Sequence, residues 1–410
     1  MAYNQGMRIA FISLMLCWTL VAEAVLFDAT GDPAYNTNAP TDALSGSGWQ
    51  FEGHFGGFLG TAVDSHYFLT ARHIGGDTNT PFVFEGTNYY PVTYYDDPAP
   101  GSDLRLWQVS GRLPTYAPFY TGTDEVGATI MVIGRGTQRG SELSNEGITN
   151  GWLWGASDSV TRWGLNQAAS IQFVNGAPYL YATFTHGAGS NECHLSVGDS
   201  GGASFMQENG VWKLAGIHYS VDGNFNTTNI GKGFSASLYD AYGLYIGEES
   251  NWKLVTNHVA TGFYSSRVSA HYDWITNVIP DFDSNANGLP DWWEARYSGS
   301  IHGLAATNDA DNDGLSNYAE WVARTDPTNA ASVLRIDAMQ TSNSTATLTF
   351  QGWSDRLYGI DARPDLLAPG GWTRVTTPLF PGTDGPTSWA DTNVLTAPTS
   401  QFYRLSVELQ

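Results

Sequence analysis

The chain has 410 residues, and its 40 acidic and 18 basic side chains give a formal net charge of −22 at pH 7. This acidity disfavours binding to nucleic acid or to an anionic membrane. Charged residues make up only 14% of the chain, so Asn, Thr, Ser and Gly must form much of the surface. The length predicts two or three domains with sizeable hydrophobic cores.

The first 24 residues have the pattern of a secretory signal peptide. A lone Arg8 precedes an apolar run from Ile9 to Val21, and Ala22-Glu23-Ala24 forms a small-residue cleavage site. We therefore expect a secreted protein, extracellular or located at the cell surface or in the periplasm. No later stretch reaches 18 uninterrupted apolar residues, so no membrane anchor is expected.

The cysteines bear on anchoring and on stability. Cys17 follows Leu16 inside the signal peptide, where a lipoprotein signal requires a small residue, so a lipid anchor is not expected. Only Cys193 remains after cleavage. The mature chain therefore cannot form an intramolecular disulfide and must be stabilised by core packing.

Residues 48 to 279 are predicted to be all-β. Short β-type runs, such as Thr129–Ile133 and Val211–Ile217, alternate with Gly, Asn and Asp turns. This pattern is typical of a barrel or sandwich. The aromatic residues of this region are expected to pack in the core rather than to bind carbohydrate, among them Trp152, Trp154 and Trp163.

The most informative motif is Gly198-Asp199-Ser200-Gly201-Gly202. A serine between glycines predicts a sharp turn at which a substrate carbonyl can approach the backbone. The amides of Gly198 and Ser200 can then point together at one developing oxyanion. Serine is a poor nucleophile unless a base takes its proton, so this interpretation requires a histidine and a carboxylate elsewhere in the chain.

Both are present upstream of the serine. Phe68–His73 is an apolar run that ends in a histidine, and Ser102–Leu106 begins a second run with Asp103. The order His73, Asp103, Ser200 is one of three orders that occur among unrelated catalytic triads.

These segments resemble the trypsin/chymotrypsin family of serine endopeptidases. The resemblance extends over residues 48–279 through further strands and a closing helix: Gly57–Val63, Tyr67–His73, Leu214–Ile217, Tyr264–Val268 and Trp274–Ile275. It implies two six-stranded barrels with the triad between them and a short C-terminal helix, in a protease domain of residues 25–279. Residues 224–261 exceed the family's usual length and are interpreted as an insertion that borders the substrate cleft.

The resemblance also suggests roles for two histidines near the serine. His194 lies at the position of the family's pocket floor, and His218 resembles the pocket histidine of bacterial glutamyl endopeptidases. Protonated imidazoles would favour an acidic substrate side chain; the alternative is that both are packed polar residues. Asp199 corresponds to the residue that binds a new N-terminus in animal enzymes. Here it would pair either with the amine of Val25 or with internal hydrogen-bond donors.

Two acidic loops follow Pro280. Each places oxygen side chains at positions 1, 3, 5, 9 and 12 with glycine at position 6, which is the spacing of an EF-hand calcium loop. They resemble the thrombospondin type 3 or dockerin-like repeats of secreted proteins, with structural Ca²⁺ as the implied cofactor within residues 280–330. The predicted ligands are Asp283, Asn285, Asn287, Leu289, Asp291 and Glu294 in the first loop, and Asp309, Asp311, Asp313, Leu315, Asn317 and Glu320 in the second. An acidic turn without a cation is the alternative.

Strand-like alternation returns between residues 331 and 410, for example at Ala346–Phe350 and Phe402–Val407. A small β-sandwich is expected, which resembles a fibronectin-III-like module.

The sequence thus predicts a secreted serine endopeptidase that acts on proteins or peptides and needs no cofactor for catalysis. One alternative is an inactive protease fold with a binding or adhesive role and calcium-stabilised modules. An esterase is disfavoured because the Gly-x-Ser-x-Gly motif is absent around Ser200.

Overall fold

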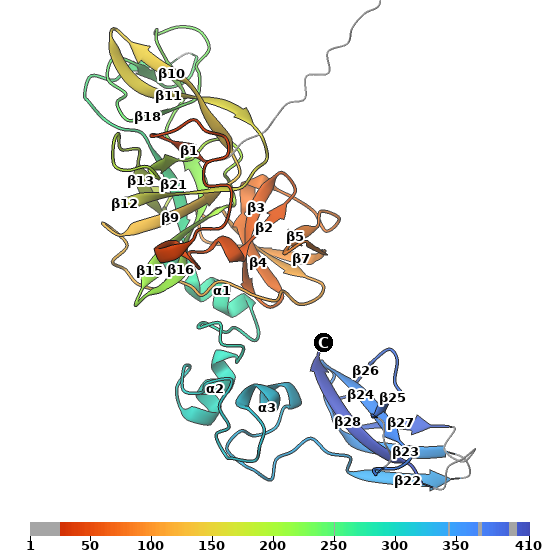
Figure 1. Cartoon of the computed structure of the whole chain (residues 1–410). Coiled ribbons are helices and arrows are strands. Elements are labelled where there is room, and N and C mark those ends of the chain that lie inside the picture. Colours follow the sequence, from red (N-terminus) through yellow and green to blue (C-terminus); the bar gives the residue numbers. More distant parts are fainter. Residues whose placement is uncertain (1–24, 250, 343–344, 368–370, 393–399) are drawn as a thin grey trace, which may run out of the picture. The chain divides into compact units, whose positions relative to one another are not determined.

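The computed structural model describes residues 25–249, 251–342, 345–367, 371–392 and 400–410 (Figure 1). The predicted signal peptide and Cys17 lie outside these residues. The chain forms two compact units. Among the described residues, the first contains 25–61, Leu69–Trp107 and Tyr120–Ala270, and the second contains Ala62–Phe68, Gln108–Phe119 and His271–Gln410.

A closed six-stranded barrel forms the core of the first unit. Its strands follow the order β12 (Arg162–Val174), β13 (Ala177–Thr183), β21 (Gly262–Arg267), β16 (Val211–Val221), β15 (Ala203–Glu208) and β9 (Thr129–Gly134). Ile130 and Val132 alternate along β9 and pack with Leu180, Met206 and Phe263. Full burial of one such side chain contributes about 1.5–3 kcal/mol. Cys193 is buried and free, so this packing stabilises the barrel without a disulfide.

The second predicted barrel is instead a seven-stranded sheet that does not close. Its order is β6 (Thr87–Tyr89), β5 (Phe82–Phe84), β2 (Glu52–Phe55), β3 (Phe58–Asp64), β4 (Tyr67–Ala71), β8 (Leu104–Val109) and β7 (Pro91–Asp96). The two edge strands β6 and β7 are separated only by Tyr90. Pro91 begins β7 and has no N–H to donate to a strand ladder, as is usual for proline at the start of an edge strand.

Two long excursions from the closed barrel build an additional layer. The first is the sheet of β10 (Thr137–Asn145), β11 (Ile148–Ser157) and β18 (Ala236–Leu238), and the second is that of β17 (Phe225–Asn226), β19 (Tyr245–Ile246) and β20 (Lys253–Leu254). They share a core that includes Phe225, Leu238 and Leu244, with Leu153 from β11 packed against it. Residues 224–261, predicted to be an insertion, thus pack on the β10–β11 hairpin.

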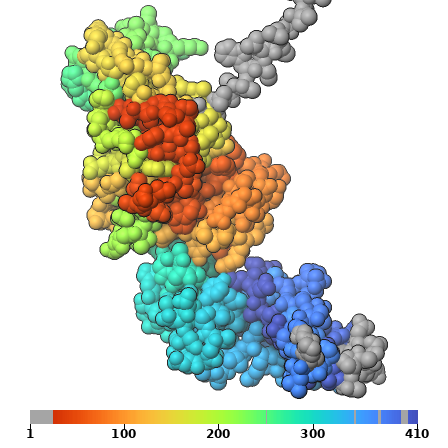
Figure 2. Space-filling view, viewed as in Figure 1, coloured from red at the N-terminus to blue at the C-terminus, as the bar shows by residue number. Residues whose placement is uncertain are grey.

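The N-terminal residues are held against the closed barrel. β1 (Leu26–Phe27) pairs with β14 (Cys193–His194), and Asn36 Nδ2 donates to Trp163 O at 2.9 Å. Figure 2 shows these residues, coloured red, lying on the yellow and green residues of the barrel. Short 3-10 helices cover Asp42–Leu44, Trp49–Phe51, Arg72–Ile74 and Val268–Ala270.

The second unit contains the three α-helices, α1 (Tyr272–Val278), α2 (Asp291–Ser298) and α3 (Asn317–Ala323). α2 and α3 follow the two acidic loops and share a small core of Leu289, Trp293 and Trp321. α1 includes the predicted helical pair Trp274–Ile275. Within the described part of the chain, none of the helices is long and apolar enough to span a membrane.

Two small sheets complete the second unit. One has the order β22 (Ala338–Ser342), β23 (Thr345–Gly352) and β27 (Gly385–Asp391); the other contains β25 (Thr373–Arg374), β24 (Arg356–Arg363), β26 (Phe380–Pro381) and β28 (Phe402–Leu409). Leu348 and Phe350 of the first sheet share a core with Tyr358 and Ile360 of the second. The buried Arg356 joins β24 to α3, because its Nε donates to Val322 O at 2.8 Å. The resemblance to a fibronectin-III-like module remains a prediction.

Candidate active site

His73 and Asp103 lie where two neighbouring strands of the seven-stranded sheet meet their loops. β4 ends at Ala71, and the 3-10 turn that follows carries His73, whereas Asp103 directly precedes β8. Asp103 Oδ2 is 2.6 Å from His73 Nδ1, and Asp103 Oδ1 accepts a 3.0 Å hydrogen bond from the His73 N–H. The buried carboxylate therefore fixes the position of the ring and favours the tautomer with its proton on Nδ1.

Ser200 lies on the other side of the imidazole. Its Oγ is 2.8 Å from His73 Nε2, so both ring nitrogens are engaged. The turn around Ser200 requires glycine, since Gly198 has φ +97° and Gly201 has φ +80°. A Cβ on Gly201 would also lie 2.5 Å from Leu59 O. The structure thus brings the three predicted side chains together in the geometry of nucleophile, base and orienting carboxylate.

The backbone amides of the same turn differ in their hydrogen bonding. The N–H groups of Asp199, Gly201 and Gly202 donate to Ser196 O, His218 O and Asp199 O, at 3.2, 3.1 and 3.1 Å. Among the described residues, the N–H groups of Gly198 and Ser200 have no such backbone partner. These two amides are therefore available to an oxygen that approaches the turn.

Asp199 points away from the serine into the protein interior. Its Oδ1 accepts from the N–H groups of Gly136 at 2.6 Å and Val25 at 3.4 Å, and its Oδ2 accepts from the Ser196 N–H at 2.7 Å. Burial raises the pKa of this carboxyl to about 6, and these hydrogen bonds counteract the shift. The predicted internal donors are therefore present and include the backbone N–H of Val25, whereas pairing with a free Val25 amine remains a prediction.

His194 lies in the core rather than at a ligand site. Its Nδ1 is 2.6 Å from Leu195 O and 2.9 Å from Ser237 Oγ, and its ring contacts Phe184 and Phe263 edge-on. Burial lowers the pKa of His194 to about 4. The histidine predicted to form the pocket floor is therefore neutral at pH 7, and its Nδ1 is already occupied by protein groups.

His218 does line a pocket, but it is also buried. Its Nδ1 is 3.0 Å from Ser265 Oγ, and burial lowers its pKa to about 3. The imidazole is therefore neutral at pH 7 and does not supply the positive charge on which the predicted preference for an acidic side chain depends.

The pocket beside Ser200 has a volume of about 220 Å³. It is lined by Trp154, Leu195, Ser196, Val197, Asp199, Ser200, His218, Tyr219, Ser220 and Val221. Trp154 was expected to pack in the core, and its place in this pocket was not predicted from the sequence. Trp154 lies on β11, which pairs with both β10 and β18, and these long-range pairings position it beside the pocket.

The second acidic loop gathers three carboxylates. Ligand oxygens of Asp309, Asp311 and Asp313 lie within 4.8 Å of one another. The loop is closed by its own backbone, because the Gly314 N–H donates to Asp309 Oδ2 at 2.9 Å and the Leu315 N–H donates to Asp313 Oδ1 at 2.8 Å. This group could bind a cation.

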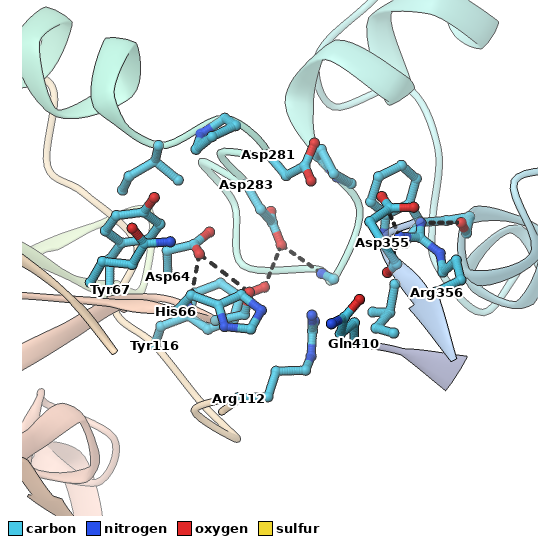
Figure 3. Close-up of a pocket in the computed structure, with 18 residues that line it drawn as sticks. Asp64, His66, Tyr67, Arg112, Tyr116, Asp281, Asp283, Asp355, Arg356 and Gln410 are labelled. Carbon is cyan, nitrogen blue, oxygen red and sulfur yellow. Dashed lines mark hydrogen bonds and ion pairs between the residues drawn. The ribbon is translucent and has the colours of Figure 1, made fainter. Parts of the chain in front are cut away.

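The first loop repeats this pattern. The Gly288 N–H donates to Asp283 Oδ2 at 2.7 Å, and the Leu289 N–H donates to Asn287 Oδ1 at 2.8 Å. Figure 3 shows a difference, in that the Tyr116 hydroxyl also points to Asp283 and donates to its Oδ2 at 2.8 Å. Asn285 Oδ1 accepts from the Asn287 N–H, and Asp291 Oδ1 accepts from Ser284. The first loop thus has additional hydrogen bonds, to Asp283 from Tyr116 and to Asp291 from Ser284, and fewer charges than the second loop.

The glutamates at position 12 of the two loops, Glu294 and Glu320, show whether the loops are suited to a cation. Glu294 and Glu320 are fully buried, and the Oε2 of each has no hydrogen-bond partner within the described residues. Burial, together with the neighbouring acidic groups, raises the pKa of each to about 7. Buried carboxylate oxygens without donors are unfavourable unless a proton or a cation compensates them, so these residues fit Ca²⁺.

Position 9 differs between the loops. In the second loop, Asn317 Nδ2 donates to Ala305 O at 2.8 Å, and Asn317 Oδ1 has no partner among the described residues. Its oxygen is therefore available to a cation, whereas Asp291 in the first loop already accepts from Ser284.

Comparison with known proteins gives little further information. No protein-family model matches the chain, and no curated protein matches its sequence. Among solved structures, the chain is similar to neuropsin, a serine protease expressed in the limbic system of mouse brain. That match has 13% identity and a TM-score of 0.35, and it covers 57% of this chain and 96% of neuropsin. A likeness at this level carries no argument about activity or substrate.

Proposed function

We propose that this protein is a secreted serine endopeptidase with a trypsin-like catalytic arrangement. The observation that carries the proposal is the continuous contact from Asp103 Oδ2 through His73 to Ser200 Oγ, with distances of 2.6 and 2.8 Å. These residues come from three separate segments of the chain, so the sequence does not bring them together by proximity. A nucleophile, a base and an orienting group within hydrogen-bond reach are the requirements for acyl transfer.

In the proposed mechanism, Ser200 Oγ attacks the scissile carbonyl while His73 Nε2 takes its proton. Asp103 stabilises the resulting imidazolium at Nδ1. The N–H groups of Gly198 and Ser200 donate to the oxyanion of the tetrahedral intermediate. The C–N bond then breaks, and His73 returns the proton to the leaving amine, which leaves an acyl group on Ser200. A water molecule, deprotonated by His73, hydrolyses this ester and restores the serine.

No cofactor is needed for these steps, and we assign a structural role to calcium. Each acidic loop would hold one Ca²⁺ through oxygens at positions 1, 3, 5 and 12 and through the carbonyl at position 7, with position 9 acting directly or through water. The proposal is supported by the unpaired Oε2 atoms of Glu294 and Glu320. Because these ligands and the triad belong to different compact units, we expect calcium to affect stability rather than chemistry.

The direct test is labelling with a fluorophosphonate probe, which forms a covalent bond only with an activated serine. The wild-type protein should gain one probe mass, and Ser200→Ala should gain none. Hydrolysis of a denatured protein substrate distinguishes an endopeptidase from an esterase. A folded wild-type protein that neither reacts nor cleaves would instead favour the inactive binding or adhesive protein.

A further inference from the structure

The pocket beside Ser200 has one wall that does not belong to the closed barrel. Trp154 lies on β11, in the additional layer formed by β10, β11 and β18, yet it lines the pocket together with barrel residues. Its side chain is half-buried, so part of the indole packs on protein and part remains open to the pocket. The additional layer therefore contributes a residue to the site.

Trp154 is held in place by a series of interior hydrogen bonds. Its Nε1–H donates to Ser237 Oγ at 3.1 Å, and the same Oγ is 2.9 Å from His194 Nδ1. Ser237 and His194 are fully buried. If the indole moved away, a buried hydroxyl would lose a partner, which is unfavourable. His194 is thus a positioning residue that acts on the pocket through Ser237 and Trp154.

The backbone restrains the same residue. The Trp154 N–H donates to Ser235 O at 3.2 Å, and the preceding Leu153 pairs with Ala236 of β18. β18 in turn contributes Ala236 and Leu238 to the core of the additional layer. A side chain on a supported strand is a more rigid wall than one on a free loop.

The pocket combines apolar side chains with hydroxyl groups, and one buried carboxylate also lines it. Lys and Arg do not occur among its described lining residues, and its one carboxylate, Asp199, is occupied by internal donors. A charged substrate side chain would lose hydration there without meeting an opposite charge. Trp154, Val197 and Val221 instead offer apolar surface beside a few hydroxyl groups, as is usual in pockets for uncharged groups.

We propose that Trp154 determines specificity, by packing its indole on an uncharged, apolar substrate side chain next to the scissile bond. Leucine, methionine and phenylalanine are the side chains of this class. The inference rests on the proposed endopeptidase function and deepens it by naming the substrate class. An acidic side chain, the preference predicted from the sequence, is the competing outcome.

The experiment compares kcat/KM for peptides that differ only in the residue before the cleaved bond, with Leu, Phe, Ala, Glu and Lys at that position. The variants are Trp154→Ala, Trp154→Phe and the control Trp152→Ala. Trp152 lies on the same strand, stacks on the Arg139 guanidinium with 3.8 Å between the guanidinium carbon and the ring centre, and does not line the pocket. Labelling by a small fluorophosphonate is measured in parallel, because it reports the triad without a substrate side chain.

The wild-type protein should prefer Leu and Phe. In Trp154→Ala the ratio of kcat/KM for Leu over Ala should fall at least about tenfold, which is the range for lost apolar pocket contacts. Trp154→Phe should retain most of the preference, and Trp152→Ala should keep the wild-type profile. A wild-type preference for Glu or Lys, or equal profiles in Trp154→Ala and Trp152→Ala with labelling intact, would overturn the inference alone. Absence of both labelling and cleavage in the wild type would overturn the proposed function and the inference with it.

Discussion

The triad and the two acidic loops are both clusters of polar side chains, but they differ in how far they are complete. In the triad, His73 bridges Asp103 and Ser200 through both ring nitrogens. In the loops, the buried Oε2 atoms of Glu294 and Glu320 have no partner among the described residues. We therefore expect the triad to be organised by the protein alone, and the loops to gain stability when a cation binds them.

The largest loss of activity should follow from substitutions in the triad. Ser200→Ala and His73→Ala should each lower kcat/KM by about 10⁴-fold or more, and the double variant should be little worse, because the triad acts as a unit. Peptide hydrolysis measures the loss, and an unchanged thermal midpoint shows that the fold is intact. Additive losses in the double variant, or full labelling of Ser200→Ala, would contradict the assignment.

A smaller loss of activity should follow from changing Asp199, which holds the turn that carries Ser200. Asp199→Asn replaces one acceptor oxygen with an NH₂ group, which would then face the backbone donor of either Gly136 or Ser196. The turn that carries the Gly198 and Ser200 amides should shift, with a loss of kcat of about 10²-fold, similar to that from removing an oxyanion donor. The control is Asp158→Asn, which changes a carboxylate between β11 and β12 that pairs with Arg162. Equal activity in the two variants would assign Asp199 no role in the turn.

The stability of the two acidic loops should instead depend on bound metal. A cation held at 100 times its dissociation constant stabilises the folded state by about 2.7 kcal/mol. Chelation should therefore lower the thermal midpoint of the second unit and expose residues 281–326 to proteolysis, while labelling of Ser200 persists. Glu320→Gln should weaken calcium binding in calorimetry, and the exposed Glu146→Gln should not. Wild-type protein that binds no calcium at millimolar concentration would reduce the loops to acidic turns.

The smallest effect is a pH dependence in the first unit. Burial lowers the pKa of His194 to about 4 and of His218 to about 3, below the ordinary value near 6.5. Between pH 4 and pH 6.5 these histidines bind more protons in the unfolded chain than in the folded chain. Their neutral, buried state therefore costs no stability above pH 6.5, and the free energy of unfolding falls as the pH decreases towards 4. Asp199, with a pKa raised to about 6, acts in the opposite direction at lower pH.

Buried carboxyl groups of the same unit oppose this effect, because burial raises the pKa of Glu192 to about 7 and raises the pKa of Glu52 as well. The histidine contribution is therefore measured as a difference: between pH 7 and pH 6 the thermal midpoint of the wild type should fall relative to that of His218→Phe. The same slope in both proteins would mean that His218 does not contribute.

Features that depend only on residues close together in the chain could be predicted from the sequence. The glycines around Ser200, the strand Thr129–Ile133 within β9, the helical pair Trp274–Ile275 within α1 and the spacing of the acidic loops could all be predicted. Turns with positive φ and strands with a regular pattern leave local signals, because only certain residues tolerate those backbone conformations.

Only the tertiary structure decided which side chains face a ligand. The sequence predicted both His194 and His218 as substrate-binding residues. In the structure, His194 lies in the core and His218 lines the pocket. Both are neutral at pH 7 because burial lowers their pKa values. Trp154 gave no sign of its place beside Ser200, and the Val25 nitrogen reaches Asp199 across 174 residues. Burial and long-range strand pairing set these outcomes, and neither is encoded in the spacing of nearby residues.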